Sequence, residues 1–347
     1  MRIVVVGGSG NVGTAVLGRL ARDYPKAELV GVSRRTPPPA PPYQGVGWHE
    51  IDIGSEASTP RLVEALRGAD CVVLLAWLIQ PSHDELALHR TNVEGSRRVA
   101  EACVRAGVHH LVYLSSVGAY SPGPKRRAVA EDWPTGGVAA SSYSRDKAAV
   151  EALLDELGRR EPGLTITRFR PGLILQRRAA VEIAGYFIGP LVPRAVYRGV
   201  RRGKLPVLPM PSELTLQFVH SEDVAAAVSL AIGQRAAGAF NLAADPPMPP
   251  AELARLLHAR HVPVPPWLVR AAARVSWELR LQPTSPGWVD LARWCPVLDT
   301  SRVRTELGWS PEHDARRTVL ELVEGLEAGR DHPSPALRSG RGTVNST

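Results

Sequence analysis

Hydrophobic residues along the chain follow two patterns, short unbroken apolar runs and longer stretches with a helical repeat. An unbroken β-branched run is typical of a strand that is buried on both faces. Apolar residues three and four positions apart, as in Val12, Val16, Leu17 and Leu20, are typical of a helix that packs one face on a core. The runs predict strands at 2–6, 28–32, 47–51, 71–76, 110–114 and 164–169, and the repeats predict helices at 11–22, 59–68, 84–106 and 143–159.

Strand and helix in alternation indicate a doubly wound α/β fold, in which helices cover both faces of a parallel sheet. We expect a core at 1–171, to which 213–245 returns. We expect residues 172–212 and 246–328 to form a smaller, mainly helical C-terminal part. Residues 329–347 are polar and aperiodic, which predicts a disordered tail.

Glycines at positions 7, 10 and 13 lie where the first predicted strand turns into the first predicted helix. Gly7 would allow a tight turn, Gly10 would let a pyrophosphate approach the backbone, and Gly13 would let the helix pack closely on the strand. The helix N-terminus at Asn11 and Val12 would attract the phosphates. An ordinary glycine-rich loop is the alternative, but the flanking strand and helix favour a Rossmann-type dinucleotide site.

The end of the second predicted strand bears on which dinucleotide binds. Ser33, about 20 residues past the last glycine, stands where an NAD site usually has a carboxylate for the ribose 2′-hydroxyl. Arg34 and Arg35 follow, and arginine accommodates a 2′-phosphate. This favours NADP over NAD, with two surface arginines in an arginine-rich chain as the alternative.

Tyr143 and Lys147 are four residues apart and lie one turn apart on the same helix face. A phenol loses its proton near pH ~10, which is too high for a base at neutral pH. A nearby ammonium lowers that pKa, so Tyr143 could exchange a proton with a substrate hydroxyl or carbonyl. A solvated helix face is the alternative, and the glycine loop upstream favours chemistry.

Together these motifs resemble the extended branch of the short-chain dehydrogenase/reductase superfamily, the NAD-dependent epimerase/dehydratase family, over residues 1 to about 328. The glycine spacing of that branch matches Gly7, Gly10 and Gly13. The resemblance implies that Ser116, in Ser-Ser-Val-Gly-Ala-Tyr, completes a catalytic triad with Tyr143 and Lys147.

The resemblance also implies further contacts to the cofactor, on motifs that arrive in the family's order. Lys147 would bind the nicotinamide ribose and lower the pKa of Tyr143, and Ser116 would hold the substrate oxygen. The remaining implied contacts are Asp52 and Ile53 at the adenine, Ala76 and Trp77 after the fourth strand, Asn92 on the next helix, and Pro171 after the sixth strand.

The implied activity is hydride transfer to or from a carbonyl or hydroxyl carbon, with Tyr143 as acid and base. A nucleotide-sugar epimerase or dehydratase that retains NAD is the first alternative. Such epimerases usually have an asparagine three positions after the arginine of the sixth strand, where this chain has Leu173 after Arg170. A non-catalytic dinucleotide-binding sensor or assembly protein is the second alternative, and the presence of Tyr143 and Lys147 disfavours it.

The C-terminal part is expected to cover the cofactor and form the substrate pocket. A helix is predicted at 179–203, and residues 263–295 contain Trp267, Trp277, Trp288 and Trp294. Several tryptophans in one pocket would favour an apolar or ring-shaped substrate, although any single one is more often part of a core. The loop at 121–142, between Ser116 and Tyr143, is expected to be a rim or lid of the site or a plain surface connector.

Composition narrows the remaining classes. The chain has 347 residues and a net charge of +8, but its arginines are scattered, which argues against nucleic acid. No apolar run approaches the ~20 residues of a membrane span. Three cysteines lie far apart without metal-ligand spacing, which fits a reducing, cytoplasmic protein without a metal site. We expect a small-molecule substrate, and a homodimer would form through the helices at 84–106 and 143–159.

Overall fold

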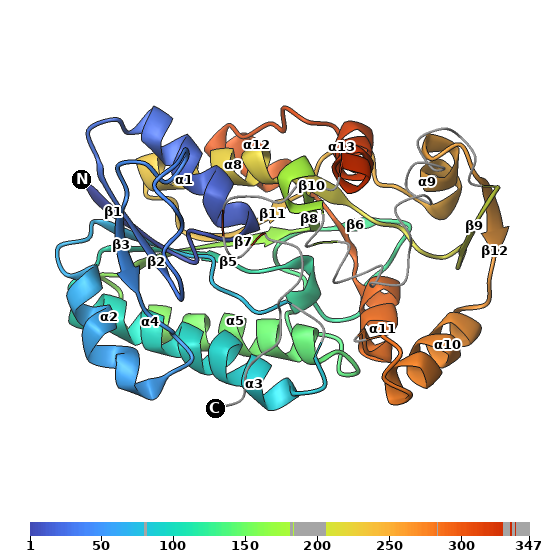
Figure 1. The fold of residues 1–347 in the computed structure, drawn as a ribbon, viewed down its shortest axis with the longest axis horizontal. Helices are drawn as coiled ribbons and strands as arrows, with labels where there is room; N and C mark the ends of the chain where they lie inside the picture. The colour runs from blue at the N-terminus through green and yellow to red at the C-terminus, as the bar shows by residue number, and fades with distance from the viewer. Residues whose placement is uncertain are drawn as a thin grey trace.

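A seven-stranded parallel sheet forms the centre of the molecule (Figure 1). The computed structural model describes residues 1–79, 82–180, 183, 206–282, 284–328, 334 and 337. The strand order is β11-β7-β5-β4-β1-β2-β3, with every neighbouring pair parallel. The strands are β1 (Arg2–Val6), β2 (Glu28–Ser33), β3 (Gly47–Glu50), β4 (Cys71–Leu74), β5 (His110–Leu114), β7 (Thr165–Pro171) and β11 (Gly238–Leu242).

Helices cover both faces of this sheet, which confirms the predicted doubly wound fold. Within β1, Ile3 and Val5 pack into one hydrophobic core, whereas Val4 and Val6 pack into the other. This alternation explains why the strand has no polar position after Arg2. One face carries α1 (Asn11–Asp23), α8 (Ser221–Gln234) and α12 (Ser301–Leu307), and the other carries α2 (Thr59–Leu66), α4 (Gly95–Arg105) and α5 (Ser142–Arg160) (Figure 1).

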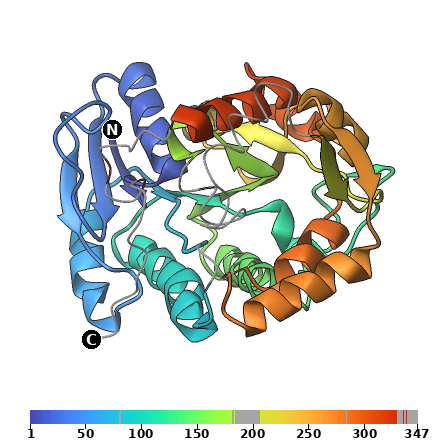
Figure 2. The same ribbon diagram turned by 45° about the vertical axis from the view of Figure 1, so that its right-hand side comes forward.

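Smaller elements gather at the carboxyl end of the sheet, and Figure 2 brings them forward. Three short parallel pairs join distant segments, namely β8 (Leu173–Leu175) with β10 (Phe218–His220), β9 (Val207–Met210) with β12 (Arg260–Pro263), and β6 (Ala128–Val129) with β13 (Val297–Leu298). The helices here are α9 (Pro250–Leu256), α10 (Pro266–Glu278), α11 (Pro286–Trp294) and α13 (Ala315–Ala328). Most of the predicted helix 179–203 lies outside the described residues.

The single helix predicted at 84–106 is divided in the structure. It consists of α3 (Glu85–His89), a π-helical turn (Arg90–Glu94) and α4. Asn92 lies in that turn, where its side chain accepts from the Leu78 N–H at 2.7 Å and donates to the Leu78 carbonyl at 3.0 Å. These bonds tie the wider turn to the segment that follows β4. The apolar periodicity of the sequence continues through the turn and therefore does not reveal it.

The predicted disordered tail at 329–347 is described at only two residues, and both are buried. Ser334 donates a hydrogen bond to the carbonyl of Ser9 at 2.6 Å, and Leu337 belongs to a small apolar core with Phe218 and Val319. Both side chains have partners inside the fold, and the disorder of the segment as a whole remains a prediction. The other domain boundaries remain predictions. Among the described residues, no helix has the length and apolar character that a membrane span needs.

A buried histidine in β5 makes stability depend on pH. His110 is 2% exposed and hydrogen-bonds Thr167 at 2.8 Å, and burial, followed by the charge of Arg235, lowers its pKa to about 4. The unfolded chain takes up this proton near pH ~6.5. Its contribution to stability is therefore complete above pH ~6.5 and is lost as the pH falls toward the pKa of the folded state.

We expect wild type to lose roughly 2–3 kcal/mol of unfolding free energy between pH 7 and pH 4 through His110 alone. His110→Gln, which can still bond Thr167 but cannot take a charge, should not show this loss. Urea unfolding at several pH values measures the difference. The neighbouring exposed His109, changed to Gln, is the matched control and should behave as wild type. Parallel pH curves for wild type and His110→Gln would contradict the assignment.

Candidate active site

The glycine loop after β1 has the backbone geometry that the sequence predicts. Gly7 has φ +89°, and a Cβ there would lie 2.5 Å from the backbone nitrogen of Ala76. A Cβ on Gly13 would collide with the carbonyl oxygen of Gly7, so only glycine lets α1 pack this closely on β1. Gly10 is the N-cap of α1 and supplies no side-chain bond to the first turn. The N–H groups around Asn11 therefore remain available for an anion.

The predicted ribose-binding position lies at the end of β2, beside this loop. Ser33 is buried and donates its hydroxyl to the carbonyl of Arg35 at 2.8 Å. Arg34 and Arg35 are exposed, and neither forms an ion pair with another described residue. Their guanidinium groups are therefore free to meet a phosphate. Glu50 lies next to them, where its carboxylate accepts from the Thr36 N–H at 2.8 Å.

The other predicted cofactor contacts lie at the carboxyl ends of neighbouring strands. Asp52 is exposed and accepts from the Gly54 N–H at 2.9 Å, whereas Ile53 is buried. Ala76 and Trp77 follow β4, and Asn92 binds the same segment through Leu78. The structure thus brings most of the predicted contacts to the carboxyl end of the sheet. Val12 at the start of α1 and Pro171 at the end of β7 lie at the same end.

Ser116 and Tyr143 are in contact. Ser116 follows β5, and its Oγ accepts from the Gly118 N–H at 2.9 Å and also hydrogen-bonds the side chain of Tyr143. Gly118 makes this approach possible, because a Cβ there would lie 2.9 Å from the Tyr143 ring. Ser144 donates its hydroxyl to the Gly118 carbonyl and so fastens the start of α5 to the same turn.

Lys147 is buried beneath this pair. The sequence predicts that its ammonium faces the Tyr143 phenol, but in the structure the ammonium bonds other groups. The Nζ atom donates to the Leu114 carbonyl at 2.9 Å and to the Tyr113 hydroxyl at 3.3 Å, and it lies 3.5 Å from the centre of the Trp77 ring. The expected lowering of the tyrosine pKa is absent. Burial raises the pKa of Tyr143 to about 12, against the opposing hydrogen bond from Ser116. Burial also holds the pKa of Lys147 well below its ordinary value.

Two indole rings flank the phenol. Trp77 meets Tyr143 edge to face with ring centres 6.0 Å apart, and Trp288 of α11 lies 4.9 Å away at a tilt of 35°. Trp288 thus brings α11 of the C-terminal part into contact with Tyr143. The Trp77 Nε1 atom is buried and has no hydrogen-bond partner among the described residues. Three other tryptophans lie in residues 263–295 with Trp288. Trp277 stacks on His83, and Trp267 and Trp294 are exposed.

The segment at 121–142 is fastened to the C-terminal part. Its strand β6 pairs with β13, and the Gly123 N–H donates to the carbonyl of Trp294 at 2.9 Å. Farther along, Gly287 of α11 packs so closely on Ala140 that a Cβ would collide with the carbonyl oxygen. These contacts favour the predicted rim of the site over a plain surface connector.

A buried ionic network lies behind the site, and the sequence motifs did not predict it. Glu151 of α5 has no exposed surface and binds Arg168 and Arg170 of β7 and Ser115 of the turn that follows β5. The sequence does contain a signal, because β7, which lies between β11 and β5 in the sheet, carries arginines at two alternate positions. Buried guanidinium groups require carboxylate partners.

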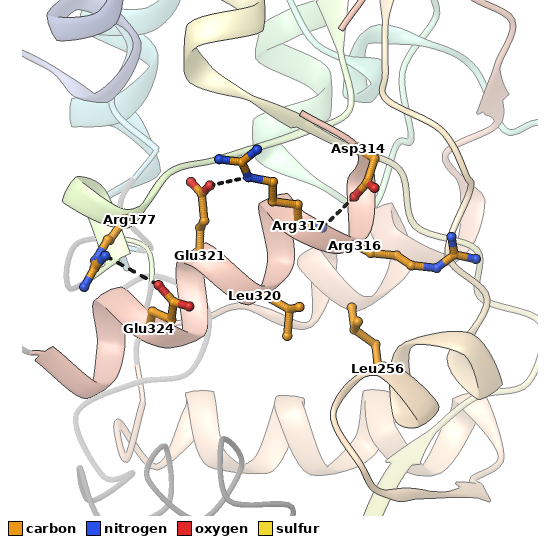
Figure 3. Close-up of a pocket in the computed structure, with 8 residues that line it drawn as sticks. All are labelled: Arg177, Leu256, Asp314, Arg316, Arg317, Leu320, Glu321 and Glu324. Atoms are coloured by element: carbon orange, nitrogen blue, oxygen red, sulfur yellow. Dashed lines mark hydrogen bonds and ion pairs between the residues drawn. The ribbon is translucent and has the colours of Figure 1, made fainter. Parts of the chain in front are cut away.

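A cavity lined mostly by charged side chains lies away from these residues. It measures about 710 Å³ and is lined by Arg177, Leu256, Asp314, Arg316, Arg317, Leu320, Glu321 and Glu324 (Figure 3). Four of its charged side chains form two ion pairs, Arg317 with Glu321 at 3.0 Å and Arg177 with Glu324 at 3.5 Å, whereas Arg316 pairs with Glu252 outside the lining. This cavity contains none of the predicted site residues. The candidate active site is therefore the carboxyl end of the sheet, where Tyr143 lies. No cluster of three or more potential metal ligands occurs among the described residues.

Comparisons with known proteins agree with this geometry. The model of the NAD dependent epimerase/dehydratase family matches residues 3–243. An uncharacterised protein of Mycobacterium tuberculosis is 26% identical over 249 residues, which span 70% of this chain but only 61% of that relative's length. The dTDP-6-deoxy-L-talose 4-dehydrogenase (NAD(P)(+)) of Kitasatospora kifunensis is 28% identical over 335 residues, 92% of this chain and 94% of that enzyme.

Among solved structures, the UDP-glucose 4-epimerase of Thermus thermophilus in complex with NAD has a TM-score of 0.70. It is 22% identical and covers 95% of this chain and 100% of its own. That likeness supports the fold, and the family match extends over most of the chain. The predicted resemblance is confirmed, and the chain belongs to the NAD dependent epimerase/dehydratase family, a family of enzymes.

Proposed function

We propose that the protein is an NAD(P)-dependent oxidoreductase that transfers hydride to or from a carbonyl or hydroxyl carbon, with Tyr143 as acid and base. The observation that carries this proposal is the contact between Ser116 and Tyr143 above the buried Lys147. The three side chains come from the end of β5 and the first turns of α5. They lie at the same carboxyl end of the sheet as the glycine loop, and ligands of open α/β folds bind at that end.

The residues at the carboxyl end of the sheet fit a dinucleotide. The tight turn at Gly7, the uncapped N-terminus of α1 and the free guanidinium groups of Arg34 and Arg35 match a pyrophosphate and a 2′-phosphate. Lys147 would hold the nicotinamide ribose, and its partners Leu114 and Tyr113 would orient its ammonium. The nicotinamide ring, when bound, supplies or accepts the hydride.

The protein itself supplies the proton, which is held on the hydroxyl oxygen of Tyr143. With a pKa of about 12, the Tyr143 phenol keeps its proton at neutral pH and is set up as a donor. Ser116 would accept or donate at the same substrate oxygen and align it with that phenol. The rings of Trp77 and Trp288 narrow the space around Tyr143 and exclude water. This arrangement favours reduction of a carbonyl.

The substrate side favours a reductase over a sugar epimerase. Arg170 is not followed by the asparagine of nucleotide-sugar epimerases, and its guanidinium is committed to Glu151 and Tyr120. Trp77 and Trp288 present aromatic faces that suit an apolar or ring-shaped ketone. A nucleotide-sugar epimerase or dehydratase with retained NAD remains the second candidate, because one of the similar solved structures is a UDP-glucose 4-epimerase in complex with NAD.

The cofactor present in freshly purified protein separates these two candidates. A reductase must exchange its cofactor in every cycle, so we expect an empty site that takes up added NADPH. Extraction and chromatography of the nucleotide measure this. Stoichiometric, tightly held NAD would favour the epimerase instead.

The end of β2 should set the cofactor preference, and we propose NADP as the preferred cofactor. In Ser33→Asp/Arg34→Ala, the new carboxylate would accept a bond from a ribose 2′-hydroxyl and repel a 2′-phosphate. The lost guanidinium removes a charge-assisted bond worth ~1.5–3 kcal/mol, or roughly tenfold or more in affinity. We expect the ratio of the NADH and NADPH dissociation constants to shift toward NADH by at least that factor. An unchanged ratio would mean that Arg34 is only a surface residue.

A further inference from the structure

Glu151 lies on the same face of α5 as the two proposed site residues. Tyr143, Lys147 and Glu151 follow one another at intervals of four residues, so each is one turn from the next. Lys147 is 3% exposed and Glu151 has no exposed surface. A carboxylate is rarely this buried unless charged partners surround it.

The partners of Glu151 come from two segments around the site, β7 and the turn after β5. Its carboxylate accepts from Arg170 Nε at 2.9 Å and Nη2 at 3.0 Å, and from Arg168 Nη1 at 3.1 Å. It also accepts from Ser115 Oγ at 2.6 Å. Ser115 directly precedes Ser116, so this bond ties the backbone of the serine turn to α5. Arg170 extends the network to the Tyr120 hydroxyl at 3.0 Å.

We infer that Glu151 is a positioning residue of the active site, which fixes the serine turn to α5 and places a negative charge one helical turn from the ammonium of Lys147. This inference rests on the proposed function for the roles of Ser116 and Lys147. It assigns to one buried carboxylate two tasks, one geometric and one electrostatic. Neither task requires Glu151 to touch a substrate or a cofactor.

The electrostatic task follows from the charges around Lys147. Burial lowers the pKa of Lys147, and two negative groups oppose this effect, first Glu151 and then Asp146. Asp146 is engaged with His89 at 2.8 Å. The other groups facing the ammonium are the Tyr113 hydroxyl, the Leu114 carbonyl and the Trp77 ring, none of which carries a full charge at neutral pH.

Without the Glu151 carboxylate, Lys147 would share its surroundings with two poorly compensated guanidinium groups. Arg170 and Arg168 both point at that carboxylate, and the other ion pair of Arg168 within the described part of the chain is with the half-exposed Asp155 at 2.6 Å. A like charge nearby disfavours protonation. The Glu151→Gln protein should therefore release the Lys147 proton at a lower pH than wild type.

The chain has four lysines, Lys26, Lys125, Lys147 and Lys204, so the titration of one can be followed directly. Protein labelled with ¹³C at lysine Cε gives one resonance for each lysine, and Lys147→Met identifies the relevant one. We expect Glu151→Gln to lower the midpoint of the Lys147 resonance by about one pH unit, in protein without added cofactor. In an activity assay, the alkaline limb of the rate should move in the same direction.

Asp155→Asn is the matched control. It removes another carboxylate of α5 that pairs with Arg168, but Asp155 does not bond Ser115. Its Lys147 midpoint should stay within about 0.3 units of wild type, since exposed charges interact weakly. A Glu151→Gln protein that folds and keeps the wild-type midpoint would overturn the inference. A purely structural role predicts that result, with only the melting temperature lowered.

If Glu151→Gln fails to fold, Arg168→Gln decides the question. That change frees part of the carboxylate from a competing positive charge, so the Lys147 midpoint should rise, and an unchanged midpoint overturns the inference. The titration is independent of turnover. A protein that reduces no carbonyl compound would sink the proposed function and leave the titration result as it stands.

Discussion

The Tyr143→Phe protein is expected to lose roughly 1,000-fold in kcat/KM, within the range that a positioned proton donor contributes. Dinucleotide affinity should remain within about twofold, because only the hydroxyl is removed and the ring keeps its contacts with Trp77 and Trp288. Steady-state rates on an identified substrate and equilibrium titration with NADPH measure the two quantities separately.

Tyr24→Phe is the matched control for that experiment. Its phenol donates to the Ser229 carbonyl at 2.8 Å, on the opposite face of the sheet from α5. The variant should keep wild-type rates while losing about 1 kcal/mol of stability. Wild-type activity in Tyr143→Phe would exclude the tyrosine as proton donor, whereas loss of cofactor binding would reassign it to the binding site.

The Gly10→Ala protein is expected to bind dinucleotide about 100-fold more weakly than wild type, which corresponds to about 2.8 kcal/mol. Gly10 has φ −79°, and a Cβ there meets nothing closer than the Gly7 carbonyl oxygen at 3.5 Å. The protein itself therefore accommodates the methyl group. The methyl group would instead occupy the space that a pyrophosphate needs at the start of α1.

Thermal melting and cofactor titration separate binding from stability in this case. The unfolding free energy of Gly10→Ala should stay within about 1 kcal/mol of wild type. Gly18→Ala is the control, because it lies farther along α1, where its Cβ would make ordinary contact with Pro42 at 3.4 Å. Equal affinities for all three proteins would show that the dinucleotide does not lie on this loop.

Local sequence rules predicted the frame of the site well. The strand before Gly7, the helix after it and the three glycines depend on residues close in sequence, and each has its own steric signature. The same holds for the end of β5 at Ser116 and for the start of α5 at Tyr143. Parallel topology then places these ends together without further information.

The interior of the site could not be predicted in the same way. Spacing placed Lys147 on the face of Tyr143, but the direction of its ammonium depends on Leu114, Tyr113 and Trp77, which come from other strands. Burial, which no helical repeat reveals, reversed the expected pKa of Tyr143. Glu151 was missed for a similar reason, because its importance appears only when β7 lies beside α5.

The most direct test of the central claim is the transfer of deuterium from NADPH labelled at the nicotinamide C4 to a carbonyl compound. Wild-type protein is incubated with the labelled cofactor and a set of aromatic and cyclic ketones, and the products are analysed by mass spectrometry. A hydride transferase that uses Tyr143 predicts an alcohol with one carbon-bound deuterium, formed by wild type and not by Tyr143→Phe. Cofactor binding without deuterium in any product, or epimerisation of a nucleotide sugar with no net consumption of cofactor, would contradict it.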